Sequence, residues 1–136
     1  VTHNDATSIA ACVAWLSLLW QLLAMSEPPD PLWWPETWAG VARRLEGETR
    51  LRSRGGAYAD YEGPLWRLVI DTVPEVYRQG LSVEAACNAW HSGAYLLETV
   101  PCCLYILMRH AQDPEEAIVR AANDTRDSDT AAAMSA

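Results

Sequence analysis

Three carboxylates and three hydroxyls stand within eight residues near the end of the chain, in the run Asn123–Thr130. Asp127 and Asp129 are separated by a single residue, so in a turn their side chains can converge on one point. Thr130 adds a hydroxyl beside them. Hard oxygen ligands of this kind suit Mg²⁺, Mn²⁺ or Ca²⁺. The spacing therefore predicts a candidate site for a divalent cation.

The same run has a simpler interpretation, and the residues alone leave both open. An Asp-Ser-Asp-Thr sequence in front of Ala131-Ala132-Ala133 is also typical of an ordinary helix N-cap. An EF-hand is excluded, because no Gly occupies the sixth loop position and no Glu the twelfth. Two carboxylates and one hydroxyl do not fill a six-oxygen shell, so a metal would need further ligands from elsewhere.

A polar, glycine-bearing segment over residues 47–64 carries three alternating arginines, which have two interpretations. They can form a phosphate-binding cluster, or they can belong to a solvated loop in which Glu46 and Glu48 neutralise part of their charge. We expect the second. The arginines are Arg50, Arg52 and Arg54.

The elements that must position these groups follow from the periodicity of apolar residues, which is helical throughout. Residues 6–25 read as a helix buried on most sides, and prolines between 28 and 35 delay the next helix. Pro74 marks a kink or break. No sustained alternation or hairpin signal indicates strands, so we expect an all-α fold. The predicted helices span 6–25, 36–46, 64–79, 82–90, 95–110, 113–122 and 131 onward.

Composition limits the class of protein. A chain of 136 residues fits one domain, 1–136, and 50% hydrophobic with 21% charged residues is typical of a globular protein. The net charge of −8 argues against nucleic acid or an anionic membrane as partner. The longest apolar stretch, 9–25, is shorter than a membrane span, which needs about 20 residues. No signal peptide is visible at the N-terminus.

The four cysteines form neither a C-x-x-C pair nor a zinc spacing. All lie in apolar, helix-like segments, so we expect buried free thiols in a reducing compartment and a cytoplasmic protein. The cysteines are Cys12, Cys87, Cys102 and Cys103.

Three segments together resemble the ADP-ribosylglycohydrolase family, which includes the dinitrogenase-reductase-activating glycohydrolases. The most specific is a helix ending at Asn123, followed by Asp127-Ser128-Asp129-Thr130 and small residues. Ser92-Gly93-Ala94-Tyr95, continuing to Pro101, is similar to the family segment that precedes it. Thr2-His3-Asn4-Asp5 before a long apolar helix is similar to a mid-domain element. Thr125-Arg126 replaces the Gly-Gly usual in the late motif.

The resemblance implies a multi-helical hydrolase that uses two magnesium ions, with manganese as an alternative. Such an enzyme cleaves the glycosidic bond between ADP-ribose and a protein side chain or related acceptor. Its partners are then an ADP-ribosylated protein or an ADP-ribose-containing small molecule. By position, the residues that match metal ligands are Asp127, Asp129 and Thr130, and those that match the substrate pocket are His3, Ser92, Gly93 and Tyr95.

The family's early segment, with its Gly-Asp motif, catalytic acidic residue and further Asp-rich motif, has no counterpart in this sequence. We therefore expect residues 1–136 to be the C-terminal half of the domain and inactive alone, with apolar faces of 6–25 and 95–110 left exposed. One alternative is a non-catalytic family member or partner subunit. Another is a helical interaction domain whose Trp-rich segment, 33–38, binds a partner.

Overall fold

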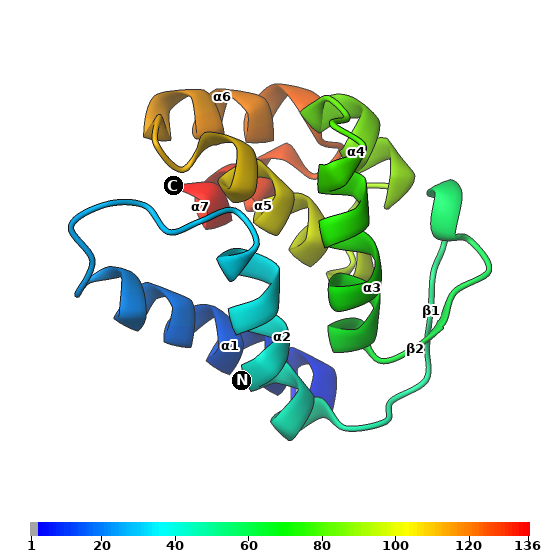
Figure 1. Cartoon of the computed structure of the whole chain (residues 1–136). Helices are drawn as coiled ribbons and strands as arrows, with labels where there is room; N and C mark the ends of the chain where they lie inside the picture. The colour runs from blue at the N-terminus through cyan, green and yellow to red at the C-terminus, as the bar shows by residue number, and fades with distance from the viewer. Residues whose placement is uncertain (1–2) are drawn as a thin grey trace.

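The computed structural model describes residues 3–136, and Val1 and Thr2 lie outside it. Within these residues the chain forms seven α-helices, which confirms the all-α expectation. α5 contacts each of the other six helices and is the centre of the packing (Figure 1). The helices are α1 (Ala6–Leu22), α2 (Trp33–Glu46), α3 (Leu65–Arg78), α4 (Val83–Ala89), α5 (Leu96–His110), α6 (Pro114–Asp124) and α7 (Ser128–Ser135).

The central position of α5 follows from its sequence. Every residue from Leu97 to Ile106 is buried. A helix that is apolar on all sides is stable only when other elements surround it. The expectation that 95–110 would leave an apolar face exposed is therefore wrong, because the remaining helices cover it.

Side-chain caps place the starts of three helices where the sequence predicts them. Asp5, Ser82 and Asp113 each accept a hydrogen bond from a backbone N–H in the first turn of α1, α4 and α6. Each cap satisfies a donor that the helix itself leaves unpaired. Gly80, with φ of 68°, lies just beyond α3 in the left-handed conformation that glycine adopts without strain.

Proline positions explain two corrections. α2 begins at Trp33 rather than 36, because Pro35 falls in the first turn, where its missing N–H would have no partner within the helix. α3 continues through Pro74 to Arg78 without a break.

Near the C-terminus α6 extends to Asp124 and α7 already begins at Ser128, so the polar loop is shorter than predicted.

Segment 47–64 contains structure that the sequence does not reveal. β1 (Leu51–Arg52) pairs antiparallel with β2 (Glu62–Gly63), and the 3₁₀ turn η1 (Gly56–Tyr58) lies between them. Strands of two residues are too short to show an alternating pattern. The segment runs along the outer side of α3 and returns to it (Figure 1).

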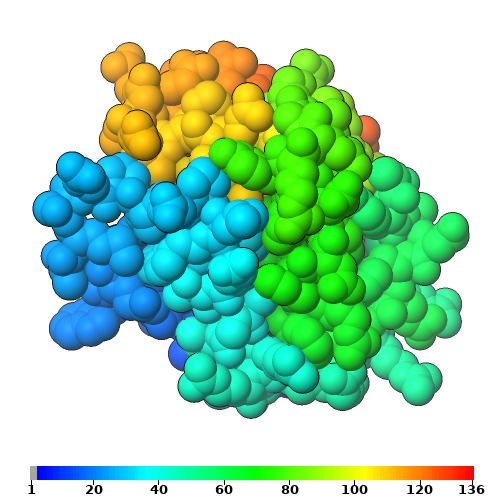
Figure 2. All heavy atoms as spheres, viewed as in Figure 1, coloured from blue at the N-terminus to red at the C-terminus, as the bar shows by residue number. Residues whose placement is uncertain are grey.

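A buried carboxylate joins the ends of this segment. Glu46, the last residue of α2, is 6% exposed and accepts hydrogen bonds from the N–H groups of Leu65 and Trp66, each at 3.0 Å. The hydroxyl of Thr7 donates to the same carboxylate at 2.8 Å. Glu46 thereby ties α1, α2 and the start of α3 together, and α2 and α3 lie side by side in Figure 2.

α1 is less buried than predicted. Its inner face carries small residues, but a stripe at helical spacing is exposed, which corrects the expectation of burial on most sides. Cys12 is also exposed, whereas the other three cysteines are buried, and all four are free. No helix of residues 3–136 has the length and apolar character to cross a membrane. The exposed stripe is Ile9, Val13, Leu16, Trp20 and Leu23.

The Trp-rich segment serves packing. Trp34 and Trp38 are 4% and 0% exposed and belong to the core. They join the core that α5 centres, so the interpretation of 33–38 as a partner-binding surface is wrong for these two side chains.

Trp38 offers a test of this core. Trp38→Ala should lower the free energy of unfolding by about 3–5 kcal/mol, because a fully buried aromatic side chain is removed and a cavity remains. Trp20→Ala is the matched control, since Trp20 is 77% exposed, and should stay within about 0.5 kcal/mol of wild type. Urea unfolding measures both, and equal losses would contradict the assignment.

Candidate functional site

The turn between α4 and α5 holds three of the residues expected in the substrate pocket. His91 and Ser92 adopt positive φ angles of 71° and 45°, a conformation that costs energy in residues other than glycine. The Ser92 carbonyl accepts hydrogen bonds from the N–H groups of Arg126 and Asp127, each at 3.1 Å. Ser92 Oγ accepts a further bond from the Arg126 N–H at 3.2 Å. The Ser92 turn is thus attached directly to the start of α7.

The attachment brings the expected metal residues to the same place. Asp127 occupies the N-cap position of α7 but makes no side-chain capping hydrogen bond, unlike the caps of α1, α4 and α6. Asp129 and Thr130 are exposed in the first turn of α7. The Thr130 N–H, and next a side-chain hydrogen bond with Asp127, hold the pKa of Asp129 below its usual value. The two carboxylates are therefore neighbours.

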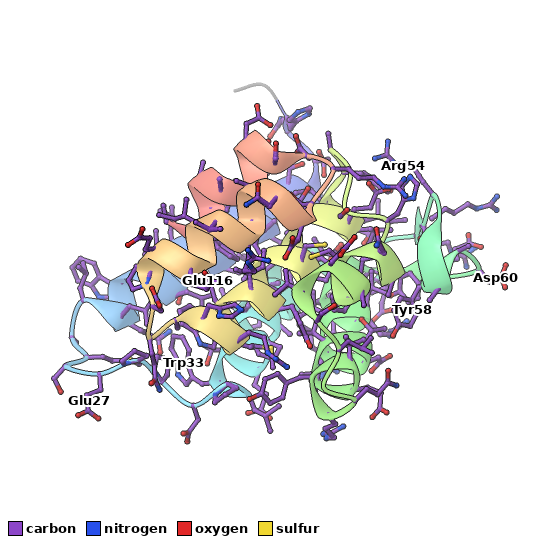
Figure 3. All side chains as sticks on the ribbon, turned by 90° about the horizontal axis from the view of Figure 1, so that it is seen from above. Glu27, Trp33, Arg54, Tyr58, Asp60 and Glu116 are labelled. Atoms are coloured by element: carbon purple, nitrogen blue, oxygen red, sulfur yellow. The ribbon has the colours of Figure 1, made fainter. Side chains whose placement is uncertain are left out.

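An ion pair between a buried carboxylate and a half-exposed arginine lies against the Ser92 turn. Glu98, in the first turn of α5, is fully buried, and its two oxygens accept hydrogen bonds from Arg54 Nε at 2.8 Å and Nη2 at 2.9 Å. These bonds raise the pKa of Arg54. Two parallel bonds of this kind are the strongest pairing available to a carboxylate in proteins. In Figure 3 Arg54 lies beside the segment that joins α4 and α5.

Tyr95 and Gly93 complete the support. The Arg54 guanidinium lies 4.6 Å from the centre of the Tyr95 ring, a cation–π contact. Burial raises the pKa of Tyr95, and the Arg54 charge lowers it in part. A Cβ on Gly93 would lie 2.6 Å from Glu98 Oε2, so only glycine fits this position unless the carboxylate moves. The hydroxyl of Thr99 donates to the Gly93 carbonyl at 3.0 Å.

His3 is the first residue that the structure describes. It is exposed and precedes α1. Hydrogen bonds from Ser8 lower the pKa of the neighbouring Asp5, and His3 lowers it to a smaller extent. Within residues 3–136 no hydrogen bond joins His3 to the Ser92 turn. The described hydrogen bonds therefore join the turn of Ser92, Gly93 and Tyr95 to the start of α7, and His3 stays a prediction.

As a metal centre the cluster has donors of the right type but too few of them. Among the described residues no group of three or more His, Cys, Asp or Glu side chains is placed to hold an ion. Asp127 and Asp129 supply two neighbouring carboxylates and Thr130 a hydroxyl, which fits Mg²⁺ in chemistry and requires water or residues outside this chain to complete six ligands.

The arginines of segment 47–64 are paired differently from what the sequence suggests. Arg52 approaches Glu62 at 3.6 Å, Arg54 binds Glu98, and Glu48 pairs with Arg67 rather than with the alternating arginines. Neutralisation by Glu46 and Glu48 is therefore wrong. The pairing of Arg54 with Glu98 was missed because 44 residues separate them, and no local pattern signals it.

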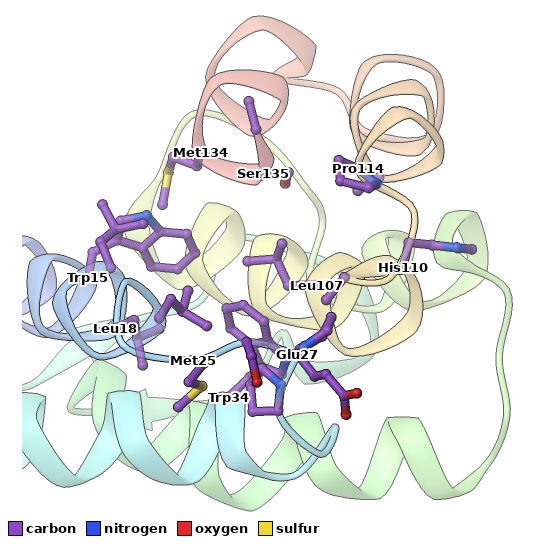
Figure 4. Close-up of a pocket in the computed structure, with 18 residues that line it drawn as sticks. Trp15, Leu18, Met25, Glu27, Trp34, Leu107, His110, Pro114, Met134 and Ser135 are labelled. Atoms are coloured by element: carbon purple, nitrogen blue, oxygen red, sulfur yellow. The ribbon is translucent and has the colours of Figure 1, made fainter.

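An apolar pocket of about 330 Å³ lies elsewhere, between α1, α2, α5 and α7 (Figure 4). Trp15, Trp34 and Leu107 line it, with Glu27 and His110 among the few titratable groups. None of the candidate site residues lines this pocket.

Comparison with protein-family models identifies the family of this chain. The model of the ADP-ribosylglycohydrolase family matches residues 1–136. The chain belongs to the ADP-ribosylglycohydrolase family. No curated protein and no solved structure matches it. The family and the helical architecture predicted from the sequence are thus confirmed. Membership of the ADP-ribosylglycohydrolase family suggests a glycohydrolase activity.

Gly93 tests the geometry of the Ser92 turn. Gly93→Ala should lower the free energy of unfolding by about 1–3 kcal/mol, because the new methyl displaces a carboxylate pinned by Arg54. Gly40→Ala is the matched control: nothing lies within 4 Å of its Cβ, and alanine within α2 should stabilise by about 0.5–1 kcal/mol. Chemical unfolding of both variants measures the difference, and a harmless Gly93→Ala would refute the tight contact.

Proposed function

We propose that this chain forms part of a magnesium-dependent hydrolase that cleaves the glycosidic bond between ADP-ribose and a modified protein or a related acceptor. The observation that carries the proposal is the Asp127 carboxylate. It stands at a helix start without capping it, next to Asp129, and its backbone is bonded to the Ser92 turn. Of the two interpretations of this run, a ligand role fits a carboxylate that makes no capping hydrogen bond better than a cap.

In this proposal Asp127, Asp129 and Thr130 hold magnesium, with two ions expected in the complete site and manganese as a substitute. When bound, such ions orient substrate oxygens and stabilise developing negative charge. The helix start contributes as well, since its unpaired N–H groups and dipole favour a negative charge on Asp129. The lowered pKa of Asp129 agrees with this.

The Ser92 turn serves as the substrate side of the site. The Ser92 carbonyl and Oγ both accept hydrogen bonds from the α7 side, and the residue is 3% exposed, so in this proposal Ser92 holds the turn in place beside the metal ligands. Gly93 allows close approach of the turn to Glu98. The Tyr95 ring lies against the Arg54 guanidinium beside the same turn. His3 stays a predicted substrate contact that the described contacts do not join to the turn.

The catalytic acid or base belongs, in this proposal, to a part of the protein outside residues 1–136. The shortage of metal ligands among residues 3–136 supports it. It equally favours the second candidate function, a non-catalytic family member or partner subunit. The four free cysteines agree with the proposed cytoplasmic location.

The proposal predicts the effect of removing either carboxylate. In the natural full-length protein, Asp127→Asn and Asp129→Asn should each lower magnesium-dependent ADP-ribosyl hydrolysis more than about 100-fold, because changes even around metal ligands cost about 10–100-fold. Asp71→Asn, at an exposed position of α3, should leave activity unchanged.

Calorimetric titration with Mn²⁺ separates the two candidate functions. A hydrolase should lose both Mn²⁺ binding and turnover in the Asp127→Asn and Asp129→Asn variants. Full-length protein that binds ADP-ribose without any turnover would favour the non-catalytic function. Wild-type turnover by both variants would refute the metal role.

A further inference from the structure

We infer that Arg54 and Arg126 form an anion site, for a phosphate or diphosphate group, across the His91–Gly93 turn from each other and beside Asp127. The inference rests on the proposed function only for the identity of the substrate that carries the anion. The arginines themselves are assigned from their contacts.

Arg54 is fixed in place yet open to solvent. Glu98 binds its Nε and Nη2, and the Tyr95 ring covers part of the guanidinium. The side chain nevertheless remains 53% exposed, and within residues 3–136 Nη1 donates no hydrogen bond. Burying a carboxylate costs several kcal/mol unless it is well paired. Glu98 here holds a half-exposed arginine in one orientation, which suits binding more than packing.

Arg126 supplies the second cation. Its Nη1 lies 3.2 Å and 3.3 Å from the two ring nitrogens of His91, and its side chain is exposed. No carboxylate of the described residues lies within ion-pair distance of it. The Arg126 N–H donates hydrogen bonds to the Ser92 carbonyl and Oγ, so the backbone from which this side chain extends is fixed in place.

Both arginines lie against the same turn, His91–Gly93. A Cβ on Gly55, the residue after Arg54, would lie 2.8 Å from His91 Nδ1, and His91 touches Arg126. A Cβ on Gly93 would lie 3.6 Å from Arg54 Nη2. The guanidinium fork matches phosphate oxygens in pairs. Asp127 directly follows Arg126, so an anion bound here needs both arginines to offset that carboxylate.

The test is calorimetric titration of the full chain with sodium pyrophosphate in EDTA, which removes divalent cations. Arg126→Gln should weaken binding about tenfold or more, the loss expected for a charge-assisted hydrogen bond. Arg54→Gln is combined with Glu98→Gln, because Arg54→Gln alone leaves the Glu98 charge buried without a partner and destabilises the fold. This double variant should weaken binding by a similar factor. Arg52→Gln, on the same segment and 80% exposed, should stay within about twofold.

Arg54→Lys keeps a cation for Glu98 but loses the planar fork, so it should fold normally and still bind pyrophosphate more weakly than wild type. Circular dichroism of each variant confirms folding. Absence of pyrophosphate binding by wild type, or an equal loss in Arg52→Gln, would overturn the inference. Asp129→Asn should not weaken this metal-free binding. Failure of the proposed hydrolase function would instead appear as absent turnover with pyrophosphate binding intact.

Discussion

A carboxylate removed entirely from water constrains the arrangement around it, and Glu98 in the first turn of α5 is such a group. Its burial is tolerable only because the Arg54 guanidinium meets both oxygens. Segment 47–64 must therefore reach over to α5, although it begins and ends at α2 and α3. Gly93 must lack a side chain, since a Cβ would collide with Glu98. The position of the Ser92 turn is thus a consequence of where this charge is buried.

Glu46 is a second buried carboxylate, and backbone N–H groups rather than an arginine compensate for its burial. It ends α2 and accepts the N–H groups of Leu65 and Trp66, which the start of α3 leaves without helical acceptors. Segment 47–64 is consequently anchored at both ends by Glu46 and near its middle by Glu98. A polar loop with little apolar surface of its own gains a defined path in this way, and Arg54 arrives at the site in a fixed orientation.

What the sequence predicts and what it misses divide along the range of the interactions. Caps such as Asp5 and Asp113 act within one turn, so their residue types and spacing are sufficient. The pairing of Arg54 with Glu98 joins residues 44 apart, and nothing in either neighbourhood announces it. The motif around Asp127 was recognisable by type and by family resemblance. The sequence does not reveal that Asp127 leaves α7 without a side-chain cap, because the same residue types serve as caps and as metal ligands. Only the three-dimensional structure distinguishes the two.

The hydrogen bonds that precede α7 fix the backbone on which Asp127 stands. The Ser92 carbonyl accepts the N–H groups of Arg126 and Asp127. The ψ of Asp127 is 66°, close to the 86° of Asp113, which does cap its helix, so the backbone alone does not decide whether a carboxylate caps. What distinguishes Asp127 is its neighbour Asp129, whose side chain it meets instead of the helix N–H groups. Glu98, buried in α5, supports the turn that carries Ser92, so the burial of one charge is linked through this turn to the pair of carboxylates at the start of α7.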